Sequence, residues 1–150
     1  MKIKKIIFTV LFMIFSLVIH AQNQMFKTPG CMCCDRWVDH MKIYGFDLEI
    51  IPSSKMDQLK EELRVPDELR GCHTTVIDGI IVEGHVPADL VVKILKDRPD
   101  GIVGISVPGM PMGSPGMEGA FKDEYAVMVF DSKGKVQFYE MRWKTFPLIN

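Results

Sequence analysis

Hydrophobic and polar positions along residues 24–99 follow two alternating periods. Short apolar runs with strand character are separated by stretches in which apolar residues recur every three or four positions, the spacing of an amphipathic helix. Asp78-Gly79 lies between two of the apolar runs and is a strong signal for a β-hairpin. The pattern predicts strands over Gln24 to Lys27, Phe46 to Ile51, Thr74 to Ile77 and Ile80 to Glu83, and helices over Cys33 to Tyr44, through Met56, Leu59 and Leu63 with Ser53 or Ser54 as cap, and from Pro87 to the residue before Pro99.

The predicted order of these elements is β-α-β-α-β-β-α, which is typical of a thioredoxin-like α/β domain. The remaining residues add a strand over Ile102 to Val107 and a second hairpin, with strands over Tyr125 to Phe130 and Lys135 to Glu140. The segment from Pro108 to Gly119 is rich in Met, Gly and Pro and cannot form regular structure. The predicted fold is therefore a thioredoxin-like domain with an additional C-terminal β-hairpin and a Met/Gly/Pro-rich loop.

The first 21 residues have the pattern of a secretory signal peptide. A lysine-rich start precedes an apolar run from Ile6 to Ile19, and Ala21 offers a small residue for cleavage. A run of 14 residues is shorter than the roughly 20 that a membrane-spanning helix needs. We expect residues 1–21 to be the signal peptide and residues 22–150 a single domain that is exported, to the periplasm, without a stable membrane anchor.

Charge argues against one class of partner. Removing residues 1–21 takes away three lysines and no acid, which changes the net charge from −1 to −4. A mildly acidic chain without basic runs is not expected to bind nucleic acid.

The cysteines are the most informative residues. Three of the four lie at Cys31, Cys33 and Cys34, and the fourth is Cys72. Residues three apart share a helix face, so Cys31 and Cys34 could bind one ion or form one disulfide. Cys33 is rotated by about 100° from Cys34 on a helix. Three thiolates can therefore serve one site only if Cys31 precedes the helix or if sulfurs bridge several ions.

Ligand chemistry favours copper. Thiolates and thioethers are soft ligands that suit Cu(I), whereas structural zinc sites usually combine two separated Cys-x-x-Cys pairs, of which this chain has one. Met110 and Met117, on the Gly/Pro loop, are candidate thioether ligands as much as packing residues, and Met112 is interpreted as packing.

The histidines are not equivalent. His73 adjoins Cys72 and is the best nitrogen candidate, although neighbours on a strand point to opposite faces. His85 is expected to cap a helix or to support a ligand by hydrogen bonding, and His40 to be a surface or packing residue.

Six sequence blocks follow one another along the chain: Thr28-Pro29-Gly30-Cys31-Met32-Cys33-Cys34, Trp37-Val38-Asp39-His40, Gly45-Phe46, Gly71-Cys72-His73-Thr74, Val82-Glu83-Gly84-His85-Val86-Pro87 and Val107-Pro108-Gly109-Met110-Pro111-Met112-Gly113-Ser114-Pro115-Gly116-Met117-Glu118. Together they resemble the CopG-type family of exported copper-resistance proteins, also described as a domain of unknown function. The resemblance implies a thioredoxin-like domain whose cysteines hold copper, a thiolate-bridged multinuclear cluster being one arrangement that it allows. It also implies a role in copper tolerance and in changing the oxidation state of copper.

The sequence thus predicts an exported copper-binding protein of copper homeostasis. Its expected metal ligands are Cys31, Cys33, Cys34 and Cys72, with His73, Met110 and Met117 as secondary candidates. Its expected partners are copper ions and other periplasmic copper-handling or electron-transfer proteins, and binding is favoured over turnover as a copper oxidoreductase.

Two other functions stay open. A periplasmic thiol–disulfide oxidoreductase would use Cys31 as the attacking thiol and Cys34 to resolve the mixed disulfide. Such enzymes usually carry a proline just before the third strand, where this chain has Cys72 and His73. The second alternative is an interaction module held by structural zinc or by disulfides.

Overall fold

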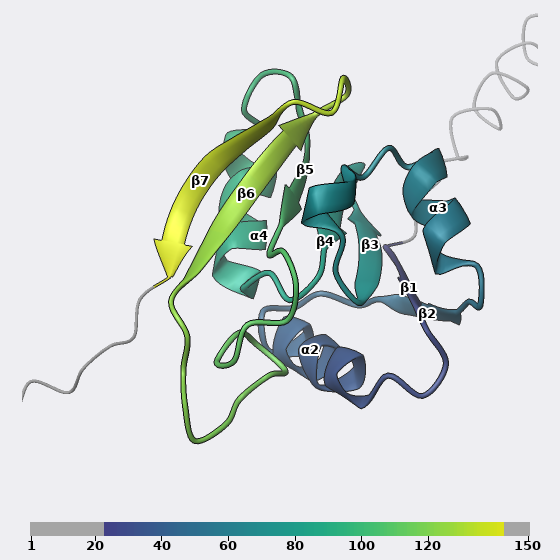
Figure 1. Cartoon of the computed structure of the whole chain (residues 1–150), viewed down its shortest axis with the longest axis vertical. Helices are drawn as coiled ribbons and strands as arrows, with labels where there is room; N and C mark the ends of the chain where they lie inside the picture. The colour runs from purple at the N-terminus through teal and green to yellow at the C-terminus, as the bar shows by residue number, and fades with distance from the viewer. Residues whose placement is uncertain (1–22, 143–150) are drawn as a thin grey trace, which may run out of the picture.

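The computed structural model describes residues 23–142, and the signal peptide expected at residues 1–21 lies outside that range. None of the helices in the described part is both long and apolar enough to span a bilayer. The elements, labelled in Figure 1, are β1 (Gln24–Lys27), α2 (Met32–Ile43), β2 (Glu49–Pro52), α3 (Met56–Glu62), the 3₁₀ turn η1 (Asp67–Leu69), β3 (His73–Ile77), β4 (Ile80–Glu83), α4 (Ala88–Asp97), β5 (Ile102–Ser106), β6 (Tyr125–Asp131) and β7 (Val136–Arg142).

All of these strands join one mixed sheet in the order β2-β1-β3-β4-β5-β6-β7. β1 pairs in parallel with β2, and β4 pairs in parallel with β5. The other neighbours are antiparallel. The strand expected from Phe46 begins only at Glu49, because the Phe46 amide donates back to the carbonyl of Met41 at the end of α2. The additional strand and the second hairpin thus extend the sheet beyond β4.

Helices cover both faces of the sheet (Figure 1). On one face α2 and α4 pack their apolar residues, among them Trp37, Met41 and Leu90, against the sheet in the larger core cluster. On the other face a smaller cluster includes Leu69 of η1 and Phe130 of β6. Since successive strand residues alternate between faces, each strand contributes to both layers.

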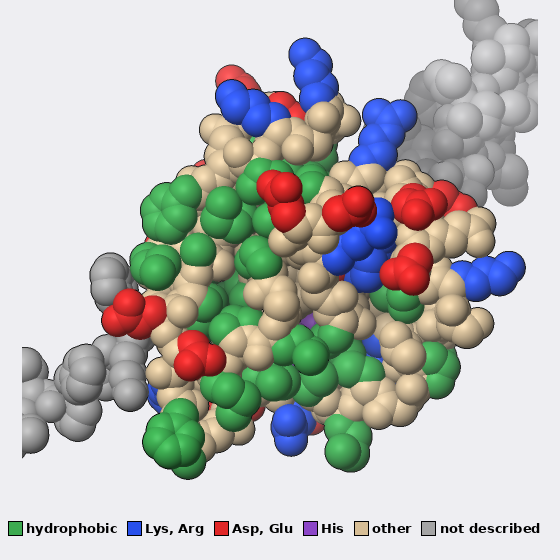
Figure 2. Space-filling view, viewed as in Figure 1, with side chains coloured by type: hydrophobic (Ala, Val, Ile, Leu, Met, Phe, Trp, Pro, Cys, Tyr) green, Lys and Arg blue, Asp and Glu red, His purple; other side chains and the backbone are tan. Residues whose placement is uncertain are grey.

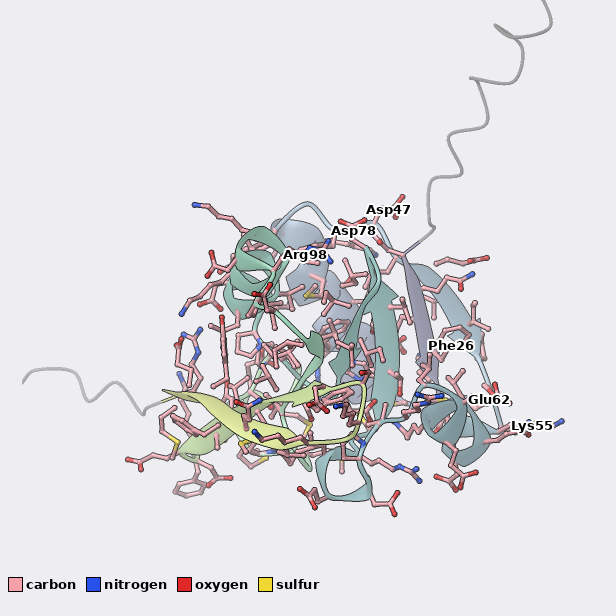
Figure 3. All side chains as sticks on the ribbon, turned by 90° about the horizontal axis from the view of Figure 1, so that it is seen from above. Phe26, Asp47, Lys55, Glu62, Asp78 and Arg98 are labelled. Carbon is pink, nitrogen blue, oxygen red and sulfur yellow. A yellow bond between two sulfur atoms is a disulfide. The ribbon has the colours of Figure 1, made fainter. Side chains whose placement is uncertain are left out.

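The turn between β3 and β4 is tied to the end of α4. Arg98 ends that helix in the left-handed region, with φ of 43°, and its Nη1 donates to the carbonyl of Asp78 at 2.9 Å. Figure 3 shows the two labelled residues at the same end of the molecule. The β3–β4 hairpin and α4 are therefore held together at the end opposite to the residues that connect β4 to α4.

A histidine joins the two helices of the larger core. Nε2 of His40 on α2 accepts a hydrogen bond from the backbone N–H of Ala88, the first residue of α4, at 3.0 Å. This satisfies one of the helix N–H groups that lack an intrahelical partner. Burial lowers the pKa of His40, and the negative charges of Glu118 and Asp89 oppose that shift. His40 thus packs between the two helices, in line with the packing role expected from the sequence, and it also caps α4, which the sequence did not indicate.

We predict that the contribution of His40 to stability depends on pH. Only neutral His40 can accept from Ala88, and its pKa is lowered on folding, so its stabilisation is complete above the unfolded pKa of 6.5 and is lost as pH falls below it. His40→Leu should lower the free energy of unfolding by about 1 kcal/mol at pH 8 and by much less at pH 5. Urea unfolding of both proteins at the two pH values measures this. An equal loss at both pH values would contradict it.

Candidate metal centre

The loop after β1 places Cys31 outside α2. Gly30 has a φ of +80°, and the amide of Cys31 donates to the carbonyl of Thr28 at 3.2 Å. Cys31 then serves as the N-cap of α2 in an extended conformation, with φ −70° and ψ 94°. Cys33 and Cys34 follow in the first helical turn. This meets the condition under which three cysteines can share one site.

A buried lysine fixes this loop to β1. Nζ of Lys27 donates to the carbonyl of Cys31 at 3.3 Å and forms an ion pair with Asp35. Lysine side chains are seldom buried unless their charge is paired, and the buried Lys27 is paired with Asp35. Lys27 of β1 therefore fixes the position of Cys31 relative to the sheet through the Cys31 carbonyl and through Asp35 of α2.

Two glycines bring the other half of the site together. A Cβ on Gly71 would lie 2.9 Å from Cα of Gly84, and a Cβ on Gly84 would lie 2.7 Å from the carbonyl oxygen of Val107. Gly84 also has a φ of +70° and donates from its amide to the carbonyl of His73 at 2.9 Å. The backbone that precedes Cys72 thus touches the backbone that precedes His85, as no larger residue would allow.

The four cysteine sulfurs converge at the start of α2. Cys31 and Cys34 form a disulfide, and Cys33 and Cys72 are free thiols. Sγ of Cys72 lies 3.4 Å from that of Cys34, 3.9 Å from that of Cys33 and 4.0 Å from that of Cys31. Sγ of Cys31 lies 3.4 Å from that of Cys33. Thiolates that share a tetrahedral metal at about 2.3 Å are about 3.8 Å apart, so these spacings suit metal ligands.

The disulfide defines the state that the structure describes. Two of the four thiols are consumed in it, and two electrons with two protons would return Cys31 and Cys34 to thiols. All four sulfurs lie within 4.8 Å of one another, so reduction of the disulfide would give four thiols in one group.

His85 makes the closest contact with a free thiol. Its Nε2 lies 3.0 Å from Sγ of Cys72, and its Nδ1 lies 2.7 Å from the carbonyl oxygen of Pro115. A carbonyl only accepts, so Nδ1 carries the proton and the lone pair of Nε2 faces the sulfur. Burial lowers the pKa of His85 and raises the pKa of Cys72 to about 12, the latter with a further contribution from Cys33. The Cys72 thiol therefore donates to a neutral imidazole.

His73 lies beside the same sulfur. Cys72 precedes β3 and is not part of the strand, so the two side chains are not forced to opposite faces, and Nδ1 of His73 is 3.5 Å from Sγ of Cys72. The ring packs 4.5 Å from that of Trp37 and 5.0 Å from that of His85. Burial lowers the pKa of His73 well below its usual value, and electrostatic interactions with His85, Lys60 and Lys27 act in the same direction.

One buried atom of this cluster is unsatisfied. Nε2 of His73 has no hydrogen-bond partner within residues 23–142, although such an atom ordinarily costs about 1–3 kcal/mol to leave unpaired. His73, His85 and Cys72 form a second group of converging ligand atoms, which shares Cys72 with the four-cysteine group. Four sulfurs and two imidazoles, one of them with an unsatisfied nitrogen, fit a soft metal ion. Both histidines are fully buried, and little histidine surface reaches the face seen in Figure 2.

The Met/Gly/Pro-rich loop packs against the site. A Cβ on Gly116, whose φ is +84°, would lie 2.6 Å from the carbonyl oxygen of Cys33 and 2.9 Å from the amide nitrogen of Trp37. Nε of Arg36 donates to the carbonyl of Gly116 at 2.9 Å. These contacts fasten the loop to α2, and the bond of His85 to Pro115 fastens it to the connection between β4 and α4.

The methionines of the loop are placed unequally. Met117 directly follows Gly116 and is partly buried, whereas Met110 is 53% exposed. Met112, interpreted from the sequence as packing, is 37% exposed, and its methyl group lies close to Gly119. The structure thus brings Gly116, the residue before Met117, against the backbone of Cys33, whereas the Met110 side chain is exposed.

Sequence reasoning ranked His85 below His73 as a ligand, yet His85 makes the shorter contact with Cys72. The usable signal was local: Gly84 precedes it at the end of a strand, and a glycine there indicates close backbone approach. What the sequence could not give is the Pro115 carbonyl, 30 residues away, that fixes the tautomer.

We predict that Gly116→Ala detaches the loop from the site. The added methyl group meets backbone atoms of α2 and requires a strained φ, so the variant should be less stable by about 1–3 kcal/mol. Backbone amides of residues 113–118 should exchange with solvent faster, by hydrogen exchange and mass spectrometry. Gly109→Ala is a matched control, because its φ is also positive at +69° but open space surrounds its Cα. Equal exchange in the two variants would show that the contact with Cys33 and Trp37 does not hold the loop.

The comparisons with known proteins identify the family of this chain. The family model described as "Protein of unknown function, DUF411" matches residues 69–117. Two solved structures, "Copper resistance protein copG- Form 2" and "Copper resistance protein copG- Form 1", are each 37% identical to the chain with a TM-score of 0.75. The match covers 81% of this chain and 97% and 96% of the two structures, respectively. No curated protein matches the chain in sequence. With this identity over nearly the full length of solved relatives, the chain belongs to the CopG family of copper resistance proteins.

Proposed function

We propose that this protein binds copper for copper resistance, on Cys31, Cys33, Cys34 and Cys72 together with His85 and His73. The observation that carries the proposal is the convergence of the four sulfurs, with Nε2 of His85 at 3.0 Å from one of them. The similarity to solved structures whose titles read copper resistance protein supports copper as the metal.

The donor set supports more than one copper ion. A tetrahedral structural zinc ion needs four ligands, whereas six donors converge here and Cys72 belongs to both groups. A sulfur shared between two groups is the arrangement in which a thiolate bridges metal ions. Cu(I) suits such soft ligands, and we therefore propose a thiolate-bridged copper cluster in the reduced protein.

Proton release accompanies binding in this proposal. The Cys72 thiol is protonated at neutral pH because burial raises its pKa to about 12, and the proton lies on the hydrogen bond to Nε2 of His85. Copper would replace that proton and be bound by both Sγ of Cys72 and the lone pair on Nε2 of His85. Metal sites that displace ligand protons hold metal less tightly as the pH falls.

The sheet order supports the finer description of the fold as thioredoxin-like. The first four strands take the order β2-β1-β3-β4, with β1 and β2 parallel and joined by α2 and with β3 antiparallel to both of its neighbours. The cysteine loop lies between β1 and α2, where a thioredoxin-like domain carries its Cys-x-x-Cys. We propose that this family adapts the redox position of that fold to hold metal.

The place of action and the partners are also proposals. The pattern of residues 1–21 supports export to the periplasm, as set out from the sequence. There the protein would exchange copper ions, and electrons where the oxidation state changes, with other copper-handling proteins. Met110 and Met117 remain proposed secondary ligands, Met117 with the support that its neighbour Gly116 contacts the backbone of Cys33.

One observation favours a second function, thiol–disulfide exchange. Cys31 and Cys34 form a disulfide at the N-terminus of α2, the position at which a helix favours a thiolate. In that case Cys31 would attack a substrate disulfide and Cys34 would resolve the mixed disulfide. Cys33 and Cys72 would have no role in such exchange, so they distinguish the two functions.

We predict that the reduced protein, residues 22–150, binds more than one Cu(I) and retains it against equimolar zinc. Cys33→Ser and Cys72→Ser should each lower the number of copper ions bound, because each removes a sulfur from the cluster. Titration against a chromophoric Cu(I) chelator, with metal analysis after desalting, measures both quantities. Met110→Leu with Met117→Leu, in the same titration, should weaken retention without lowering stability if the thioethers ligate.

Disulfide reductase activity provides the opposing readout. An oxidoreductase would lose turnover with Cys31→Ser or Cys34→Ser and keep it with Cys33→Ser and Cys72→Ser. That result, combined with no tight copper binding by the wild-type protein, would replace the copper proposal with the second function.

A further inference from the structure

A buried polar network lies across β3 from the thiol cluster. Nζ of Lys60 forms an ion pair with Oε1 of Glu83 and donates to Oγ1 of Thr74 at 2.8 Å. The Thr74 hydroxyl donates in turn to Oε2 of Glu83 at 2.6 Å. All three side chains are buried, so this is a closed ring of hydrogen bonds that includes a paired charge.

The same carboxylate holds the backbone next to Cys72. The amide of Gly71 donates to Oε1 of Glu83 at 2.6 Å. On the other side of Cys72, Thr74 is the Cα partner of Glu83 in the β3–β4 ladder. Glu83 itself lies two positions before His85. The network therefore touches the chain on both sides of Cys72 and reaches the segment that carries the imidazole facing it.

We propose that Lys60, Glu83 and Thr74 are positioning residues for copper binding, which hold Cys72 and His85 at ligand distance through the Gly71 amide. This inference rests on the proposed function. Partners that hydrogen-bond behind metal ligands commonly change metal affinity by roughly 10–100-fold when removed. Here the support acts on the backbone next to a ligand, at Gly71, and not on the ligand side chain.

Thr74→Val tests the proposal with a matched control on the same strand. Valine keeps the shape of threonine but removes the hydroxyl that bonds both Lys60 and Oε2 of Glu83, and Cu(I) retention should weaken about tenfold or more. Thr75→Val removes a buried hydroxyl that has no hydrogen-bond partner among the described residues, and retention should change by less than about twofold. Both are measured by Cu(I) chelator competition on the reduced protein.

A double-mutant cycle separates positioning from general stability. If the network acts through Cys72, Thr74→Val should weaken copper retention in the wild-type background and have no further effect in a Cys72→Ser background. A merely structural role would instead lower retention in both backgrounds by the same factor. That outcome, or equal retention in Thr74→Val and Thr75→Val, would overturn the inference.

A second variant removes the charges together. Breaking one half of a buried ion pair leaves an uncompensated charge, whereas apolar replacement of both halves is commonly tolerated. Lys60→Met with Glu83→Leu should thus keep the fold by urea unfolding and still lose copper affinity about tenfold, because the Gly71 amide loses its acceptor. Unchanged affinity would contradict the positioning role. A wild-type protein that retains no copper would overturn the proposed function as well.

Discussion

The close approach of Gly71 and Gly84 is the contact on which the rest of the site depends. With only hydrogen at both Cα atoms, the end of β4 lies against the residues that enter β3, and Cys72 reaches His85 at 3.0 Å. Everything else in the centre is arranged about Cys72, because its sulfur lies within 4.0 Å of the three cysteines of the α2 start. A side chain at either glycine would separate the two halves of the donor set.

Three segments of the site are each fixed by a hydrogen bond to a residue outside the cysteine cluster. Lys27 fastens the carbonyl of Cys31, and Glu83 fastens the amide of Gly71. The Pro115 carbonyl fixes the tautomer of His85. A disulfide between Cys31 and Cys34 uses the same thiols that a metal ion would bind. Metal binding therefore competes with disulfide formation, and donor atoms that are already in position favour the metal. In the disulfide state the four sulfurs already lie within 4.8 Å of one another, so the donor atoms are gathered before any metal binds.

The sequence predicted the elements well where short-range signals are strong. Asp78-Gly79 marked the β3–β4 turn, and the apolar stripe with Trp37 marked α2. It also predicted the four cysteines as one group. Whether Cys31 lies before α2 or within it could not be decided from the sequence, because that depends on the conformation of the loop at Gly30. It anticipated that His85 could support a ligand by hydrogen bonding, but it could not identify the partners of His85 or the network about Glu83, because both depend on contacts between residues distant in sequence, such as His85 with Pro115 and Lys60 with Glu83.

X-ray absorption at the copper edge of the reduced, copper-loaded protein tests the central claim most directly. The account predicts a first coordination shell dominated by sulfur with an imidazole contribution, and a copper neighbour at short distance from a shared thiolate. Cys72→Ser should lower the sulfur and the copper–copper contributions, and His85→Ala the imidazole contribution. A shell of oxygen and nitrogen alone, or one unchanged in both variants, would contradict the assignment of copper to this cluster.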